Sequence, residues 1–516
     1  MKRNESFAGR FLLLCGSNAL LQIMGFLYRI LLSRYAGPEG LGVYRLSSSI
    51  YAILHATCLS GITLAGTRFS SAWKVQHKEG AVRILVRYIF LIFVFLFLTA
   101  SSSVWFGRTY IGEVLIGDRR AAAAIPVILV CLFLTGIENV FKSVMIGLDR
   151  IDHAVVSELT EQAVRIFAAI ILLEAFQTEN AGRISVLIFS ASVVSEIFSA
   201  SIMTGMYLRM HRPKLVLPPI GYRKEVCKTV FPVSAAALCN NLISSAGAVL
   251  LPKRLTASGM STQGAVSELG RVTGVAAPII TLPLALVASL CTVTLPEVSA
   301  RFHCNDPRKI RDFSEKILRT VGLIAFPFTA LLLPLAPVIS RLFFYQPIDP
   351  KLFYLMGISC IFCYYQIVLS CFLNGCGQQG KNAVIVSCGE LLQLVLVWIL
   401  TAIPKLRIYG YIIAQCAAPI VVCSCIAFVL YRNGIICFRV RSFLLEPAAC
   451  GLLLFLWTRI FFMFYSGFCG QWAALLLTLS SSLVLYLLLL RFLGIDLRKY
   501  LMNTVVPLRT FRPMFY

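Results

Sequence analysis

The sequence contains little charge and little histidine. Only 14% of its residues are charged, against 58% that are hydrophobic, and its 516 residues include five histidines. A soluble chain of this length needs far more polar surface and normally divides into several domains. No Ser/His/Asp or metal-ligand spacing stands out. We therefore expect a membrane protein that is not an enzyme and has no metal site and no cofactor.

Nucleotide-binding and disulfide patterns are also missing. The nearest match to a phosphate-binding loop, at 375–382, reads G-x-x-x-x-G-K-N. It lacks the Ser or Thr that would hold Mg²⁺, and an apolar helix precedes it instead of a buried strand. The 18 cysteines are scattered, and the C-x-x-C from Cys360 to Cys363 has no second pair or histidine nearby. We interpret them as small apolar residues that pack helices.

What the chain has instead is a series of fourteen apolar stretches. A helix rising about 1.5 Å per residue needs about 20 residues to cross a hydrocarbon layer of about 30 Å. Backbone polar groups find no water there, so the stretches are expected to be helices, and the alternating segments of a barrel are absent. The predicted spans are residues 10–32, 41–65, 85–105, 121–146, 154–175, 184–208, 226–251, 272–295, 317–339, 352–373, 383–403, 409–430, 443–465 and 472–492.

Basic residues are unequally divided between the two sides of these spans. With the N-terminus inside, 29 lysines and arginines fall on the inside and 11 on the outside. This bias and the even number of spans predict that both termini are cytoplasmic. The net charge of +24 is then a topology signal. We do not expect nucleic-acid binding, because the basic residues lie in short loops between spans.

The chain also repeats itself weakly at an offset of 229 residues. The matching pairs are Glu39 with Glu268, Val43 with Val272, Ser70 with Ser299, Ala154 with Ala383, Val155 with Val384, and Glu161 with Glu390. Six spans fit within the offset, so the halves are expected to be parallel repeats, a transporter arrangement. We predict an N-terminal six-helix bundle at 1–215, its repeat at 216–435, a helix pair at 436–495 and a cytoplasmic tail at 496–516.

Three short motifs resemble those of a known family. They read GFLYRI at 25–30, RYAGPEGLGVY at 34–44 and LPEVS at 295–299. The chain resembles the polysaccharide-biosynthesis flippases, and more narrowly the stage V sporulation protein B group of the multidrug/oligosaccharidyl-lipid/polysaccharide exporter superfamily. The resemblance implies an all-α fold of two six-helix bundles in a V around a central cavity, with two further C-terminal helices.

The resemblance also implies a function. The family moves undecaprenyl-pyrophosphate-linked saccharides, including peptidoglycan precursors, across the bacterial cytoplasmic membrane by alternating access, and a spore-cortex precursor is one such substrate. The lipid II flippase branch has an Asp followed by Ala-Phe early in its second span, whereas residues 42–46 here read GVYRL. That branch's substrate contacts are therefore not transferred to this chain.

Two alternative functions stay open. A multidrug/cation antiporter of the same superfamily would need acidic residues in its cavity, but the first span offers only Arg10 and Arg29. A membrane scaffold or enzyme of envelope polysaccharide synthesis would need clustered Asp or His in the loops. Asp149 and Asp152 are the only close pair of that kind.

Seven basic residues remain after those assigned to the two sides, and a charge inside a span costs about 2.5–3.5 kcal/mol at the helix centre. They are Arg29, Arg45, Arg68, Lys142, Arg165, Arg271 and Arg459. Arg29 is a candidate clamp for pyrophosphate, because a guanidinium offers two parallel donors to phosphate oxygens. By the resemblance, Arg68 and Arg271 also line the cavity and are candidate substrate contacts. Pairing between helices and snorkelling to the interface are the alternatives.

A gate is predicted from the repeat. Arg68 and Glu297 are separated by the offset of 229 residues and lie at the cytoplasmic ends of the second and eighth spans. Parallel repeats place such positions opposite each other, so we predict that the two residues approach when the inner gate closes. The alternative is that each residue caps a helix end.

Acidic residues inside the spans are few. Glu138 with Lys142, and Glu161 with Arg165, have the i,i+4 spacing of pairs that neutralise each other on one helix. Glu196, near the middle of the sixth span, has no such partner, so it is the candidate ion-coupling residue. A proton gradient, a sodium gradient or the membrane potential would then drive transport.

Overall fold

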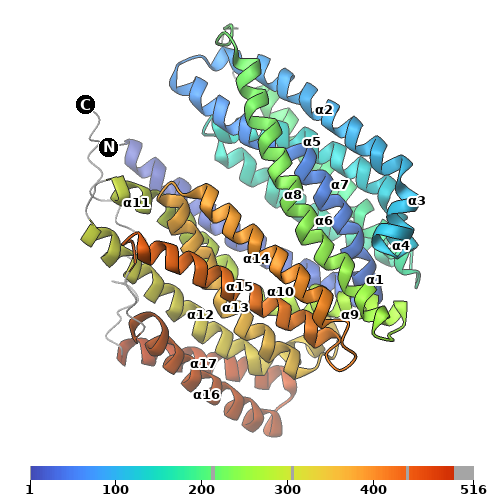
Figure 1. Cartoon of the computed structure of the whole chain (residues 1–516), viewed down its shortest axis with the longest axis vertical. Coiled ribbons are helices and arrows are strands. Elements are labelled where there is room, and N and C mark those ends of the chain that lie inside the picture. The colour runs from blue at the N-terminus through green and yellow to red at the C-terminus, as the bar shows by residue number, and fades with distance from the viewer. Residues whose placement is uncertain (1, 211–215, 304–306, 437–440, 493–516) are drawn as a thin grey trace. The chain divides into compact units, whose positions relative to one another are not determined.

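Every regular element of the chain is a helix in the residues that the structure, a computed structural model, describes: 2–210, 216–303, 307–436 and 441–492 (Figure 1). The predicted tail at 496–516 and residues 211–215, between the sixth and seventh predicted spans, lie outside this part. Helices satisfy all backbone hydrogen bonds within one segment, as a lipid environment requires. The prediction of an all-α membrane protein is confirmed.

Close packing divides the chain into two units, Met1–Val275 with Val397–Arg407, and Ala276–Leu396 with Ile408–Tyr516. The predicted bundle boundary at 215 and 216 comes from the sequence repeat and stays a prediction. The helices of the first unit include α1 (Lys2–Val75), α2 (Val82–Phe106), α3 (Arg108–Tyr110), α4 (Arg119–Ala122), α5 (Ile125–Gly147), α6 (Ile151–Ala175), α7 (Ala181–Arg209), α8 (Tyr222–Ala257) and α9 (Thr262–Gly270). A π-helix follows at Arg271–Ala276.

The first two predicted spans are the two arms of α1. They meet at Gly37, whose φ of 62° and ψ of 179° are not helical, and Pro38 follows directly. Glycine adopts this conformation without the steric penalty that a Cβ brings. The arms are the centre of the first unit: α8, α5 and α9 all pack against α1, and α6 packs against α7.

The second unit contains α10 (Ala277–Thr281), α11 (Leu284–His303), α12 (Pro307–Phe344), α13 (Pro350–Gly375), α14 (Gln379–Leu400), α15 (Ile408–Arg432), α16 (Glu446–Phe468) and α17 (Gln471–Phe492). The end of α14, from Val397, belongs to the first unit. Within the second unit α12 packs against α13 and α16, and α16 against α17 (Figure 1). The predicted C-terminal helix pair therefore corresponds to α16 and α17.

Eleven helices of the described chain are long and apolar enough to cross a membrane. One of them, Gly16–Val75, contains most of the first predicted span and all of the second. The fifth and eighth predicted spans are helical but are not among the eleven. The fifth, α6, carries several charged residues, and the eighth is divided among the π-helix, α10 and α11. The chain is a multi-pass membrane protein, and the count of fourteen spans stays a prediction.

Helix positions follow the predicted repeat. α6 begins at Ile151 and α14 at Gln379, while α7 begins at Ala181 and α15 at Ile408. Both separations are within two residues of the offset of 229. In the first unit α5 packs against α7, and in the second α13 packs against α15. The division into two repeats stays a prediction.

Candidate functional site

Two arginines on α1 lie close together without an acidic partner. Arg29 is on the first arm and Arg45 on the second, and both side chains are exposed. Tyr44 and Arg45 are the ionisable groups that act on Arg29 electrostatically. No carboxylate among the described residues contacts either guanidinium. Two like charges in a membrane region repel each other, so an anion between them would be stabilised. The sequence alone gives no role to Arg45 beyond its place among the seven basic residues of the spans.

The other predicted basic contacts have partners within the first unit. Arg68 is exposed, and its Nη1 donates to Thr229 Oγ1 of α8 at 3.3 Å. Arg271, the first residue of the π-helix, donates from Nη1 to Glu268 Oε1 at 3.0 Å. To bind a ligand, Arg68 would give up only a hydrogen bond to a neutral hydroxyl, whereas Arg271 would have to break a salt bridge with a carboxylate.

Glu297, the second member of the predicted gate, lies on α11 in the second unit. Its Oε1 accepts from Arg301 Nη2 at 2.7 Å and from Arg301 Nε at 2.9 Å. Arg68 belongs to the first unit. The predicted approach of Arg68 and Glu297 stays a prediction.

Three glutamates from three neighbouring helices converge inside the first unit. Glu138 of α5, Glu161 of α6 and Glu196 of α7 each have a carboxylate oxygen within 4.8 Å of the others. Glu138 is 2% exposed and Glu196 is 3% exposed. Like charges at such distances raise each other's electrostatic energy strongly in a low-dielectric interior. We call these three residues the glutamate cluster.

Two cations compensate part of the charge of the glutamate cluster. Lys142 Nζ lies 3.7 Å from Glu138 Oε1 and 2.6 Å from Glu158 Oε1. Arg165 contacts Glu161, and its Nη2 is 3.9 Å from Glu196 Oε1. Both predicted i,i+4 pairs are thus present. A group of three carboxylates can hold a metal ion, but these cations already lie against two of them, and we assign no metal to the cluster.

Hydroxyl groups complete the surroundings of the cluster. Ser157 Oγ donates to Glu138 Oε1 at 3.0 Å and lies 2.7 Å from Ser199 Oγ. Glu196 has fewer hydrogen bonds than Glu138, because its Oε2 is buried and has no hydrogen-bond partner in the described part of the chain. The sequence pointed to Glu196 because it lacks a helical partner, but it could not show that two further glutamates lie beside it.

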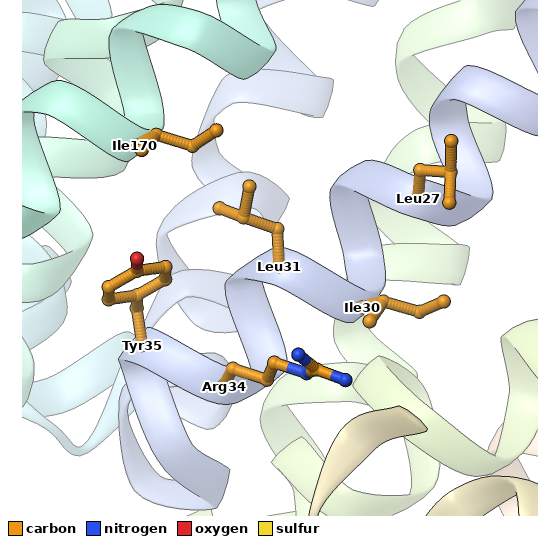
Figure 2. A pocket seen from close by; sticks show the side chains of 6 residues that line it. All are labelled: Leu27, Ile30, Leu31, Arg34, Tyr35 and Ile170. Atoms are coloured by element: carbon orange, nitrogen blue, oxygen red, sulfur yellow. The ribbon is translucent and has the colours of Figure 1, made fainter. Parts of the chain in front are cut away.

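A pocket of about 320 Å³ lies beside the first arm of α1. Figure 2 shows Leu31 and Tyr35 on the side of α1 that faces Ile170 of α6. The lining consists of Leu27, Ile30, Leu31, Arg34, Tyr35 and Ile170. The Tyr35 hydroxyl donates to Glu174 Oε1 at 2.5 Å and joins α1 to α6. The pocket therefore combines an apolar wall with a guanidinium.

Glu39, which belongs to the second sequence motif, anchors the break in α1. Its carboxylate accepts from Arg120 Nη1 at 2.5 Å and from Gln263 Nε2 at 2.7 Å. Asp118 accepts from Arg120 Nε and Nη2 at 3.0 and 2.9 Å. Hydrogen bonds to Asp118, and then to Glu39, raise the pKa of Arg120 above its ordinary value. The network ties the α1 break to the starts of α4 and α9.

Comparison with known proteins identifies the family. The polysaccharide biosynthesis protein family matches residues 9–302, more than half of the chain. The chain belongs to the polysaccharide biosynthesis protein family. This polysaccharide biosynthesis protein is also similar to stage V sporulation protein B of Bacillus subtilis (strain 168). The two are 19% identical over 459 residues, which cover 87% of this chain and 89% of the relative.

Solved structures share its fold. The lipid II flippase MurJ, in an inward closed conformation, has a TM-score of 0.62 at 14% identity, covering 93% of this chain and 99% of that one. An inward-facing multidrug resistance MATE family transporter of the MOP superfamily has a TM-score of 0.58 at 14% identity, covering 81% and 94%. This polysaccharide biosynthesis protein thus has the fold of MOP-superfamily transporters and flippases, as predicted. Its relatives are named as transporters, flippases and a sporulation protein, not as enzymes.

Proposed function

We propose that this protein is a secondary flippase that moves an undecaprenyl-pyrophosphate-linked saccharide across the bacterial cytoplasmic membrane by alternating access. The observation that carries the proposal is the pair of exposed guanidiniums, Arg29 and Arg45, on the two arms of α1. A pyrophosphate brings two negative groups and several acceptor oxygens, which match two planar donors. Arg68 and Arg271 are proposed as further contacts to the same substrate.

The pocket beside α1 supports a lipid-linked substrate. Four of its six lining residues are aliphatic, and Arg34 adds a cation (Figure 2). Such a surface suits a molecule that has both an isoprenoid chain and a charged group. The similarity to a sporulation protein supports a peptidoglycan or spore-cortex precursor as the saccharide.

Antiport of cationic drugs, the first alternative from the sequence, is supported less well, although the MATE neighbours are named as multidrug resistance transporters. A cationic substrate would need accessible carboxylates. In the described part of the first unit, Glu138 and Glu196 of the glutamate cluster are buried, whereas Arg29, Arg45 and Arg68 are exposed. The positive sign of these accessible charges therefore favours an anionic substrate.

The driving force is proposed to enter through Glu196. An ionisable side chain in a membrane span that lacks a strong partner is a coupling candidate by default. Glu196 meets this description, because its nearest cation, Arg165, is 3.9 Å away and is bound to Glu161. An ion gradient that neutralises Glu196 would then drive the conformational cycle. Both termini are proposed to lie in the cytoplasm.

Mass spectrometry of copurifying lipids tests this function. The wild-type protein and an Arg29→Ala/Arg45→Ala double variant would be purified from the same bacterial membranes in mild detergent. We expect polyprenyl-pyrophosphate saccharides to be enriched over bulk phospholipid in the wild type and to be depleted in the double variant. Equal recovery from both proteins, or enrichment of cationic compounds instead, would contradict the proposal.

A further inference from the structure

The glutamate cluster and the neighbouring Arg165 include one buried acceptor and one buried donor without a hydrogen-bond partner among the described residues. Arg165 Nε and Glu196 Oε2 are both buried, and neither makes a hydrogen bond in the described part of the chain. Leaving a buried polar group unpaired costs about 1–3 kcal/mol, and more for a charged group. The guanidinium that would satisfy Glu196 is close by, with Nη2 3.9 Å from Glu196 Oε1, but it binds Glu161. Arg165 and Glu196 therefore form only a long ion pair, and a hydrogen-bonded salt bridge between them is within reach but not made.

A charge count indicates why the bridge is not made. The cluster contributes three negative charges, and Lys142 and Arg165 contribute two positive ones. Glu158, the other partner of Lys142, is 37% exposed and is stabilised by solvent. One negative charge remains in the buried set. A single proton removes it, and a buried group that lacks compensation becomes neutral in preference to staying charged.

We assign the proton to Glu196, because the carboxylates of Glu138 and Glu161 each have a cation or hydrogen-bond donor that stabilises their ionised form. Glu138 accepts from Ser157 and lies beside Lys142, and Glu161 contacts Arg165. The cation nearest to Glu196 is Arg165, at 3.9 Å, and Oε2 of Glu196 has no hydrogen-bond partner in the described part of the chain.

The other ionisable groups on the helices that pack against α7 do not change the assignment of the proton to Glu196. From α1 and α5, Tyr51 and Cys131 face Glu196, and neither type carries a charge at neutral pH. Glu138 of α5 and Glu161 and Arg165 of α6 are the charged neighbours, and Thr135 of α5 adds a neutral hydroxyl. On α4, Arg120 is bound to Asp118 and Glu39.

We propose that Glu196 binds one proton and that Arg165 moves from Glu161 to Glu196 when this proton leaves. The proposal rests on the coupling role proposed above for Glu196 and names the ion as H⁺. The only bond that forms or breaks is the O–H bond of the carboxylic acid, and the proton is exchanged with water. Ionised Glu196 then receives Nε and Nη2 of Arg165, the bidentate geometry that guanidinium and carboxylate prefer. When Arg165 moves from Glu161 to Glu196, a salt bridge within α6 is replaced by one between α6 and α7. Proton release would in this way be coupled to the packing of the two helices.

Infrared difference spectroscopy on the full chain in lipid nanodiscs, without substrate, detects the proton directly. A buried protonated glutamate gives a carboxylic acid C=O band that disappears when the acid ionises. We expect the wild type to show one such band that titrates as the pH is raised, and we expect Glu196→Gln to lack it. Glu174→Gln is the matched control, because Glu174 lies on α6 but is exposed. A wild type without the band, or a Glu196→Gln variant that retains it, overturns the proposal.

Two variants that keep Glu196 test the movement of Arg165. In Glu161→Gln the guanidinium loses its present acid partner and is released to Glu196, so the band should disappear at lower pH. In Arg165→Gln ionised Glu196 has no cation, so the band should persist to higher pH. Each shift should be about one pH unit or more, as for a carboxyl group that gains or loses a close cation. Equal titration in both variants, or shifts in one direction, would show that Arg165 has a structural role only.

A sodium titration separates the proton from a metal ion. At constant pH and ionic strength, replacing choline chloride with NaCl should leave the acid band unchanged. Loss of the band on adding Na⁺ would show that the site takes sodium in exchange for the proton, and the proposal would be wrong. These measurements need no transport. A negative lipid analysis therefore leaves them intact, and a missing band leaves the flippase proposal standing.

Discussion

The charge of the proposed substrate is inferred from a few individual arginines. Lys142, Arg165 and Arg271 each contact a carboxylate, whereas no carboxylate among the described residues contacts Arg29 or Arg45. A paired guanidinium gains less from a ligand, because its charge is already compensated, so Arg271 is proposed as a weaker substrate contact than Arg29. The unpaired ones gain the most from an anion, which is why the substrate proposal rests on them.

Substitution of Arg29 is the corresponding test. We expect Arg29→Lys to impair transport and Arg29→Ala to impair it more, because lysine keeps the charge but loses the planar fork. A hydrogen bond to a charged group contributes about 1.5–3 kcal/mol, so Arg29→Ala should weaken substrate binding about tenfold or more. Flipping in proteoliposomes, or complementation at matched protein levels, would measure this.

Arg459→Ala serves as the control for Arg29. Arg459 is an exposed arginine on α16, in the second unit, and has no proposed role in substrate binding. Its removal should leave transport near the wild-type level. Full activity of Arg29→Ala, or equal losses in the two variants, would rule out the clamp.

The glutamate cluster shows how far sequence reasoning reaches at this scale. Both i,i+4 pairs were predictable, because their geometry depends on one helix only. The lack of a helical partner for Glu196 was also visible. The convergence of Glu138, Glu161 and Glu196 was not, since it depends on how α5, α6 and α7 pack together. The closeness of Arg45 to Arg29 was hidden for the same reason, because it depends on the path of α1 after Gly37.

At the scale of elements, the break and close packing of α1 organise the first unit. The sequence predicted two spans here, and the structure places a glycine with positive φ between them. Beyond the break, α1 approaches α9 so closely that neither backbone leaves room for a side chain. A Cβ on Gly42 would lie 2.0 Å from the carbonyl oxygen of Val266, and one on Gly270 would lie 1.9 Å from that of Pro38. Such a contact could not be read from hydropathy, which reports burial and not the distance between backbones.

Alanine at Gly42 should therefore destabilise the first unit. The added methyl group meets a backbone atom that cannot rotate away, and overpacking of this kind costs about 1–3 kcal/mol. We expect a melting temperature several degrees below that of the wild type in the same detergent. Gly25→Ala, on the first arm of α1, has no atom within 4 Å of the new Cβ and is the control. Equal melting temperatures for the two variants would show that α9 does not pack against α1 this closely.

At the scale of the whole molecule, topology follows from the distribution of basic residues. The expected cytoplasmic side carries 29 lysines and arginines against 11 on the other side. We predict that a single cysteine at Ile220, in the linker before α8, is protected from an impermeant thiol reagent in intact cells. A cysteine at Glu179, between α6 and α7, should be labelled. Both residues are exposed. The test needs a background without the native cysteines, and labelling of Ile220→Cys from outside would reverse the orientation.

The inner gate is the prediction that depends most on how the whole molecule moves. Arg68 and Glu297 are related by the sequence repeat, and each has a local partner, Thr229 for Arg68 and Arg301 for Glu297. A gate contact between them would have to compete with these partners, and desolvation of both charges would offset much of their attraction. The contact would therefore be weak, which suits a gate that breaks in every transport cycle.

Exchanging the two charges tests the gate. Arg68→Glu and Glu297→Arg should each abolish transport, because like charges would then oppose gate closure. The double variant restores opposite charges and should recover part of the activity. Recovery should be incomplete, because an arginine at 297 faces Arg301, one helical turn away on α11. Adding Arg301→Gln to the double variant should then raise the recovery further. A double variant no more active than the worse single variant would mean that the two residues do not meet, and that each serves only its own helix.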